Sequence, residues 1–205
     1  MKRLVVGMTG ATGAIFGVEL LRTLRDNDGV ETHLVLSRWA RATLHLETGL
    51  STAQVADLAD ASYAWDDQGA PISSGSFRVD AMVIVPCSMK TLAAVRTGYA
   101  DGLIARAADV ALKEHRRLVL VPRETPLSEG HLENMLALAR RGVRMVPPMP
   151  AFYNNPRSLA DVIDHIVIRI LDQLDIPTES SSRWNGMPAG RPPEIGTVRS
   201  HDHIR

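Results

Sequence analysis

Glycines and threonines near the amino terminus have the types and spacing of a phosphate-binding loop. In Gly7–Gly13 the glycines stand three residues apart, and Thr9 and Thr12 lie between them as hydroxyl donors. Glycine lets the backbone approach a ligand, and the free N–H groups that open a helix attract an anion. The spacing differs from the Gly-x-Gly-x-x-Gly dinucleotide fingerprint. The loop therefore predicts a nucleotide phosphate site, while a tight turn without a ligand stays the alternative.

Hydroxyls and cations recur in other loops that follow predicted strands. The segment Ser88-Met-Lys-Thr91 is a second donor-rich turn between a strand and a helix, and Ser37 ends another strand. A second cluster of phosphate-binding types is formed by Lys113, Arg123, Tyr153 and Arg169. A single Lys or Arg is typical of a solvated helix face. The hypothesis of a second anion site therefore depends on these side chains meeting at one end of the sheet.

Several other kinds of chemistry find no support in the residues. No Gly-x-Ser-x-Gly elbow and no metal-ligand spacing occurs, and the histidines fall on predicted elements or in the tail. The single cysteine, Cys87, is interpreted as a small buried hydrophobe rather than a nucleophile. For NAD(P), the second strand ends in Leu36-Ser37-Arg38 without a ribose-binding acid, although Arg38 suits a 2′-phosphate, and no Tyr-x-x-x-Lys pair is present. A mononucleotide such as FMN fits two short phosphate loops better.

Elements of alternating type position these loops. Strands are predicted over 2–6, 31–36, 81–85, 117–121 and 143–146, and helices over 18–25, 38–48, 51–61, 91–97, 104–115, 128–141 and 158–174. Residues 63–77 are predicted to be a functional loop. Alternation of strands and helices indicates an α/β fold, a three-layer doubly wound parallel sheet of flavodoxin or Rossmann type. Ligands of such sheets bind beyond the carboxyl ends of the strands.

Length and composition indicate one domain in a reducing compartment. The 205 residues carry 23 Lys and Arg against 23 Asp and Glu, so nothing favours nucleic acid or an anionic membrane surface. One cysteine excludes an internal disulfide framework. No signal-peptide pattern and no apolar run of roughly 18 residues is present. We expect a cytoplasmic protein with a flavin-binding domain over 1–176 and a partly flexible extension over 177–205 that carries Trp184.

Longer segments resemble the UbiX/Pad1 family of flavin prenyltransferases, formerly regarded as aromatic-acid decarboxylases. The resemblance extends from about residue 2 to Trp184, and its most specific block runs from Arg106 to Met135. It is carried by these segments: Thr9-Gly-Ala-Thr-Gly-Ala14, Pro86-Cys-Ser-Met-Lys-Thr91, Arg106-Ala-Ala-Asp-Val-Ala-Leu-Lys-Glu114, Leu118-Val-Leu-Val-Pro-Arg-Glu-Thr-Pro126, His131-Leu-Glu-Asn-Met135 and Pro150-Ala-Phe-Tyr153. Thr12 stands where many members have Ser, and the tail beyond Met187 has no counterpart.

The resemblance implies an activity, a cofactor and partners. A dimethylallyl group from dimethylallyl phosphate is joined to N5 and C6 of reduced FMN, without a metal, and the prenylated FMN serves a UbiD-type decarboxylase. The protein is expected to be a homo-oligomer, typically a dodecamer. The resemblance leaves open which decarboxylase and acid lie downstream, and whether the phosphate or the pyrophosphate donor is preferred.

The resemblance also implies roles for individual residues. FMN contacts fall on Gly10, Ala11, Thr12, Ser37, Ser88, Met89, Lys90, Thr91 and Arg123, with Arg106 reaching the site from a neighbouring subunit. Prenyl-phosphate contacts fall on Lys113, Arg123, Glu124, Tyr153 and Arg169. Glu47 corresponds to an acidic residue near the isoalloxazine, and Trp184 to an aromatic lid. With Lys113 and Glu124 they form the expected catalytic set.

Two other functions remain as alternatives at this stage. One is a flavin-dependent decarboxylase of cysteinyl peptides, which shares the fold but uses an early His as base and an Asn-rich motif. Here Glu47 is found instead, and Asn154-Asn155 lies in a different context. The other is a non-catalytic, flavin-binding accessory subunit of a larger decarboxylase complex.

Overall fold

A parallel sheet forms the centre of the chain. The computed structural model describes residues 1–178, 183 and 186. Within this part, six strands pair in the order β3-β2-β1-β4-β5-β6, and every pair is parallel. The strands are β1 (Lys2–Met8), β2 (Val30–Leu36), β3 (Ala61–Tyr63), β4 (Ala81–Cys87), β5 (Arg117–Pro122) and β6 (Arg144–Met145). The α/β class predicted from the sequence is confirmed.

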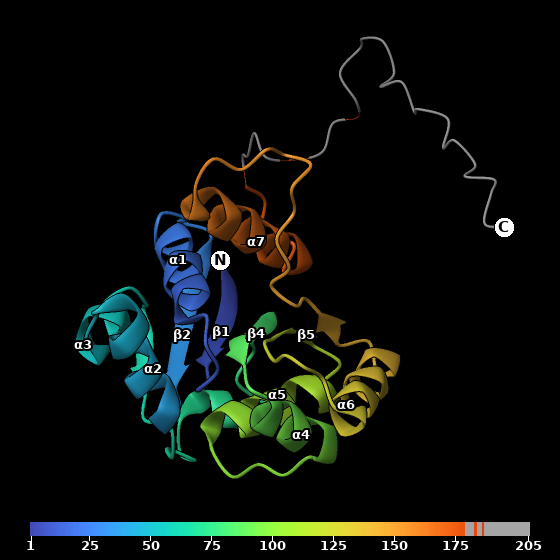
Figure 1. Cartoon of the computed structure of the whole chain (residues 1–205). Helices are drawn as coiled ribbons and strands as arrows, with labels where there is room; N and C mark the ends of the chain where they lie inside the picture. The colour runs from blue at the N-terminus through green and yellow to red at the C-terminus, as the bar shows by residue number, and fades with distance from the viewer. Residues whose placement is uncertain (179–182, 184–185, 187–205) are drawn as a thin grey trace, which may run out of the picture.

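Helices cover both faces of this sheet, which makes three layers (Figure 1). They are α1 (Ala14–Arg25), α2 (Arg38–Thr48), α3 (Thr52–Ala56), α4 (Met89–Thr97), α5 (Leu103–Lys113), α6 (Glu129–Arg140) and α7 (Leu159–Gln173), with a short 3-10 helix η1 (Pro71–Ser73). The central strands are apolar on both sides, as expected for a covered parallel sheet. Val6 and Val83 pack in the core with α1 and α7, whereas Val5 and Met82 pack in the core with α4 and α5.

The strand order produces a crevice at the middle of the sheet. From β1 the chain winds outward through β2 to β3, and from β4 it winds in the opposite direction to β6. The loops after neighbouring β1 and β4 therefore diverge. In doubly wound sheets such a switch point, at the carboxyl ends of the strands, is where ligands bind.

An unpredicted strand and a shortened helix are the main differences from the prediction, and α1 also begins at Ala14 rather than at Val18. The helix expected over 51–61 ends at Ala56, and Ala61–Tyr63 forms the edge strand β3. Asp60, which precedes β3, holds the start of this strand against β2. Its carboxylate accepts hydrogen bonds from the backbone N–H and the hydroxyl of Thr32. A strand of three residues is too short to display the alternation by which strands are recognised.

Serine side chains start the helices where the sequence predicts them. Ser37, Ser51, Ser128 and Ser158 each accept a hydrogen bond from a backbone N–H in the first turn of α2, α3, α6 and α7. Such caps satisfy donors that have no intrahelical acceptor. Among the described residues, no helix combines the length and the apolar character that crossing a membrane requires.

Candidate functional site

A cleft of about 450 Å³ lies beyond the carboxyl ends of β1, β2 and β4. Five residues predicted to contact a flavin nucleotide line it: Gly10, Ser37, Ser88, Lys90 and Thr91. They come from the loops after three different strands, so the fold assembles them although they span some 80 positions. The prediction of a site at this edge agrees with the position of the cleft.

The start of α4 supplies the densest set of donors in the cleft. The Ser88 hydroxyl caps this helix by accepting from the Thr91 N–H, at 3.3 Å, and it lies 3.1 Å from the Thr91 hydroxyl. The next residue but one, Lys90, adds a cation. The first N–H groups of a helix have no intrahelical acceptor and carry the positive end of the macrodipole. Hydroxyl, ammonium and amide donors at one helix terminus are the types that bind a phosphate ester.

Thr9 does not act as the ligand donor that the sequence suggested. Its hydroxyl donates to the Pro86 carbonyl at 2.8 Å and accepts from the Ser88 N–H at 2.7 Å. The side chain is buried. Because its only hydroxyl proton is used inside the protein, this part of the prediction is wrong. Thr9 instead ties the first glycine loop to the start of α4.

The amino end of α1 also differs from the expectation of a free anion site. The Glu47 carboxylate, at the end of α2, accepts hydrogen bonds from the backbone N–H groups of Gly13 and Ala14 at 2.9 and 2.8 Å. This carboxylate already complements the positive end of the α1 dipole. A phosphate is therefore better accommodated at the start of α4. The predicted catalytic role of Glu47 stays a prediction, and its observed contacts fix the glycine loop.

Two glycines of the loop are required for different reasons. A Cβ on Gly10 would lie 2.3 Å from the Cβ of Trp39, so only glycine allows the start of α2 to pack this closely. Gly13 has a φ of 99°, in the left-handed region that favours glycine. Ala11 and Thr12 lie between them in the same loop. The loop is thus shaped by close packing as well as by backbone conformation.

Aromatic side chains form walls that sequence reasoning missed. Trp39, Trp65 and Tyr99 line the cleft, and the Arg38 guanidinium lies 4.2 Å from the centre of the Trp65 ring. Trp39 is 76% exposed and Tyr99 66% exposed. Trp39 comes directly after Ser37-Arg38 at the end of a predicted strand, and Trp65 lies in the loop predicted over 63–77. In a chain with 4% aromatic residues, these positions are the signal that could have found them. Flat apolar walls beside phosphate donors suit an aromatic ring system such as a flavin.

The second anion cluster does not form within one chain. Lys113 ends α5 and pairs with Glu114, close to Gly75, at the end of the sheet where β5 begins. Arg123 and Glu124 directly follow β5 at its other end, and both are exposed. The expectation that these side chains meet at one edge of a single sheet is therefore wrong for Lys113.

Tyr153 and Arg169 belong to the region around α7. The Tyr153 hydroxyl lies 3.4 Å from Nε2 of buried His165, and the two rings meet edge to face. Arg169, one turn further along α7, pairs with Asp172 at 2.8 Å. His165 was interpreted from the sequence as a surface or satisfied core histidine. It is buried, but its Nδ1 has no hydrogen-bond partner among the described residues.

The remaining predicted residues fall outside the cleft of their own chain. Arg106 donates to the Ser73 carbonyl and pairs with Asp109, both at 3.0 Å. Met89 follows Ser88 but does not line the cleft. Trp184 lies outside the described residues.

The site offers neither a reactive thiol nor a set of metal ligands among the described residues. Cys87 is fully buried, and this burial strongly raises the pKa of its thiol, so the interpretation as a core residue rather than a nucleophile agrees with the structure. The described residues contain no group of three or more His, Cys, Asp or Glu that could hold a metal ion.

Known proteins resemble this chain over most of its length. The family model Flavoprotein matches residues 1–171. A probable UbiX-like flavin prenyltransferase from Streptomyces sp. (strain D7) is 71% identical over 92% of this chain and 94% of its own length. The solved structure of a dodecameric FMN-dependent UbiX-like decarboxylase from Escherichia coli O157:H7 is 62% identical, with a TM-score of 0.88 over 90% of this chain and 100% of that one. AnUbiX (PadA1), solved in complex with FMN and dimethylallyl pyrophosphate, is 54% identical, with a TM-score of 0.87 over 91% and 98% of the two chains.

Proposed function

The chain belongs to the flavoprotein family and, within it, to the UbiX/Pad1-type flavin prenyltransferases, and from this premise we propose that it prenylates reduced FMN at N5 and C6. The donor is dimethylallyl phosphate, and the product serves a UbiD-type decarboxylase. The observation that carries the proposal is the cleft in which the donor-rich start of α4 lies beside aromatic walls.

We propose that residues of this cleft hold the FMN. Ser88, Lys90 and Thr91, with the first N–H groups of α4, suit the phosphate, because all are donors at the positive end of a helix. Gly10 and Ser37 suit the opposite wall, beside the exposed Trp39 ring. Ala11, Thr12, Met89 and Arg123 complete the proposed set. Bound there, the reduced flavin supplies the nucleophilic atoms of the reaction.

The prenyl phosphate requires cations that stabilise its departing group. As the C1–O bond of the allyl group breaks, negative charge grows on the phosphate oxygens, and preorganised donors lower the barrier. Arg123, Tyr153 and Arg169 have suitable donors. Glu124 or the departing phosphate would take the proton that leaves flavin C6. Glu47 and Trp184 stay in the proposed catalytic set, with Glu47 acting through the glycine loop that it holds.

We propose that the donor site is shared between subunits. Lys113 and Arg106 lie on α5, away from the Arg123 of their own chain, so they would complete the site of a neighbour. This arrangement agrees with a homo-oligomer, and the E. coli O157:H7 relative is described as dodecameric. A cytoplasmic location is part of the same proposal.

A mass measurement tests the proposed reaction. Purified protein would be incubated anaerobically with reduced FMN and dimethylallyl phosphate, and the flavin product analysed by mass spectrometry. A flavin heavier by C5H8 is expected, and none when oxidised FMN replaces reduced FMN. A cysteinyl-peptide decarboxylase or an accessory subunit would leave the flavin mass unchanged, and that result would sink the proposal. Repeating the assay with dimethylallyl pyrophosphate identifies the preferred donor.

A further inference from the structure

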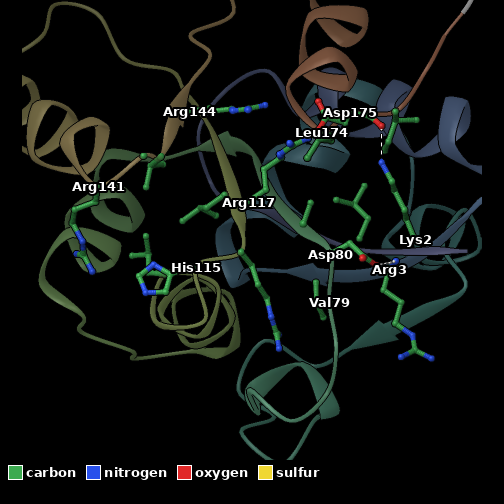
Figure 2. A pocket seen from close by; sticks show the side chains of 18 residues that line it. Lys2, Arg3, Val79, Asp80, His115, Arg117, Arg141, Arg144, Leu174 and Asp175 are labelled. Atoms are coloured by element: carbon green, nitrogen blue, oxygen red, sulfur yellow. Dashed lines mark hydrogen bonds and ion pairs between the residues drawn. The ribbon is translucent and has the colours of Figure 1, made fainter.

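A second hollow, of about 690 Å³, lies at the amino ends of the strands, whereas the candidate site lies at their carboxyl ends (Figure 2). Lys2, Ala81, Arg117 and Arg144 line it, and each is the first residue of a strand: β1, β4, β5 and β6. Residues of the loops before these strands and after α7 complete the wall. No residue of the hollow lines the cleft at the carboxyl edge.

Positive charge is concentrated in this hollow. Its lining contains six Lys or Arg side chains and two carboxylates, an excess of four positive charges in a chain with no formal net charge. The cations are Lys2, Arg3, Arg116, Arg117, Arg141 and Arg144, and the carboxylates are Asp80 and Asp175. His115 is a further group that can become cationic. Figure 2 shows Arg141 and His115 at one end, with Lys2 and Arg3 at the other.

Most of this charge is not neutralised within the described chain. Arg3 pairs with Glu31, and Arg117 pairs with Asp175. Lys2, Arg116 and Arg144 instead donate to backbone carbonyls, with distances from 2.5 to 3.0 Å. A carbonyl holds a cation in place but leaves its charge, so these groups are preorganised for an anion. The backbone N–H of Arg141 donates to the Leu138 carbonyl at 3.0 Å, but its side chain makes no hydrogen bond or ion pair with another described residue.

A structural role explains only part of the cluster. Lys2 and Arg144 contact the carbonyls of Asp175 and Gln173, where α7 ends, and cations are favourable at the negative end of a helix. Arg116, however, contacts the loop before β4, and Arg141 is the C-cap residue of α6 rather than a contact of α7. The excess charge therefore exceeds what the end of α7 requires.

We propose that this hollow binds the oligophosphate of a small molecule that also has an apolar body, the class to which nucleoside di- and triphosphates belong. Arginine is suited to phosphate because its guanidinium donates two parallel hydrogen bonds. Apolar side chains, among them the half-buried Val79 and Leu112, line the space between the cations and can cover a base. The volume lies within the range of small-molecule sites.

Calorimetric titration of the assembled, flavin-loaded protein with adenosine triphosphate tests this site. Arg141→Ala is expected to weaken binding about tenfold or more, because a charge-assisted contact is lost. Arg140→Ala is the matched control, since Arg140 is also exposed at the end of α6 but does not line the hollow. Equal affinities of these two variants, or no binding by the wild type at millimolar concentration, would overturn the proposal.

Two further arms locate the ligand and identify its parts. An excess of free FMN is expected to leave adenosine triphosphate binding unchanged, so competition between the two would place the ligand in the flavin cleft and overturn the proposal. Inorganic triphosphate is expected to bind more weakly than adenosine triphosphate, and equal binding would contradict the role of the apolar walls. Light scattering of Arg141→Ala should give the wild-type mass. If Arg141→Ala had a smaller mass and also bound no adenosine triphosphate, the hollow would be a contact between subunits, and this result would overturn the proposal.

Discussion

Single side chains of the candidate cleft combine a structural task with the proposed binding task. Ser88 caps α4 and lines the cleft, and Gly10 both forms the loop and lets α2 approach. A substitution at such a position changes stability and ligand affinity together. Variants at equivalent positions away from the cleft are therefore needed to separate the two effects.

At Gly10 a methyl group is expected to disrupt the cleft. Gly10→Ala would place a Cβ 2.3 Å from that of Trp39, so the start of α2 must move. We expect the purified variant to retain far less flavin per chain than the wild type, as measured by absorbance. Gly130→Ala is the control, because a Cβ there meets no atom within 4 Å. Wild-type flavin content in Gly10→Ala would mean that Gly10 does not shape the binding site.

The two tasks of Ser88 can be measured separately. Ser88→Ala and Ser51→Ala each remove an N-cap and should each lower the free energy of unfolding by about 1 kcal/mol. Only Ser88 lines the cleft. We therefore expect FMN affinity, measured by fluorescence quenching, to fall roughly fivefold to tenfold in Ser88→Ala alone. Equal affinity in both variants would remove Ser88 from the proposed site.

At the scale of elements, the alternation of strands and helices was predictable, including the edge strand β6 within 143–146, whereas the other edge strand, β3, was not. Hydrophobic runs marked β1, β2, β4 and β5, and serine caps marked the starts of four helices. β3 is short and depends on the contact between Asp60 and Thr32, which lie 28 positions apart. Local patterns do not contain such long-range pairings. The contact of Glu47 with the start of α1 was missed for the same reason.

The prediction that Lys113 and Arg123 belong to one anion site was wrong, and the order of the elements along the chain explains why. Lys113 ends a helix that leads into β5, whereas Arg123 follows β5. The length of β5 separates the two side chains, so Lys113 lies near the amino end of the strands and Arg123 near their carboxyl end. Chemical type alone does not tell at which end of a strand a side chain lies, and for that reason the predicted cluster contained groups that one chain does not bring together.

The pairing of β2 with β3 should make stability depend on pH. His33 of β2 contacts the hydroxyl of Tyr63 in β3, with 2.9 Å between Nδ1 and the oxygen. Burial lowers the pKa of His33, and this effect outweighs the nearby Glu31 carboxylate, which raises the pKa. The folded state therefore favours neutral His33, and its contribution is fully present above the ordinary pKa of about 6.5. The contribution is lost as the pH falls below that value toward the lowered pKa of the folded state.

Thermal unfolding between pH 7.5 and 5.5 checks this expectation. As the pH is lowered, the melting temperature of the wild type should decrease. The decrease should be smaller in His33→Gln, because glutamine has no group that titrates in this range. His45→Gln serves as control because His45 is exposed on α2. An unchanged pH dependence in His33→Gln would show that another group is responsible.

At the scale of the whole molecule, the proposed activity requires more than one chain. The cleft is built from the loops of one sheet, but Lys113 and Arg106 lie elsewhere on the same subunit. Assembly would therefore supply chemistry as well as stability. The proposal predicts that two inactive chains can restore each other's function.

Co-expression of two differently tagged variants tests this prediction. Lys113→Met and Arg123→Ala should each be nearly inactive alone, since each lacks a cation for the leaving phosphate. If each site takes Arg123 from one chain and Lys113 from another, random mixing leaves about a quarter of the sites intact. Product formation by the mixed oligomer should recover to about that level. No recovery, with mixed oligomers verified by both tags, would refute shared sites.

The brevity of the two outer strands limits how these chains can assemble. β3 has three residues and β6 has two, so little unpaired backbone is available for another chain to extend the sheet. Short edges of this kind discourage both strand addition and fibre formation. In the proposed homo-oligomer, we therefore expect subunits to meet through helices and loops rather than through added strands. The contacts between copies can consequently change in evolution, one surface residue at a time, while the sheet that carries the cleft stays the same.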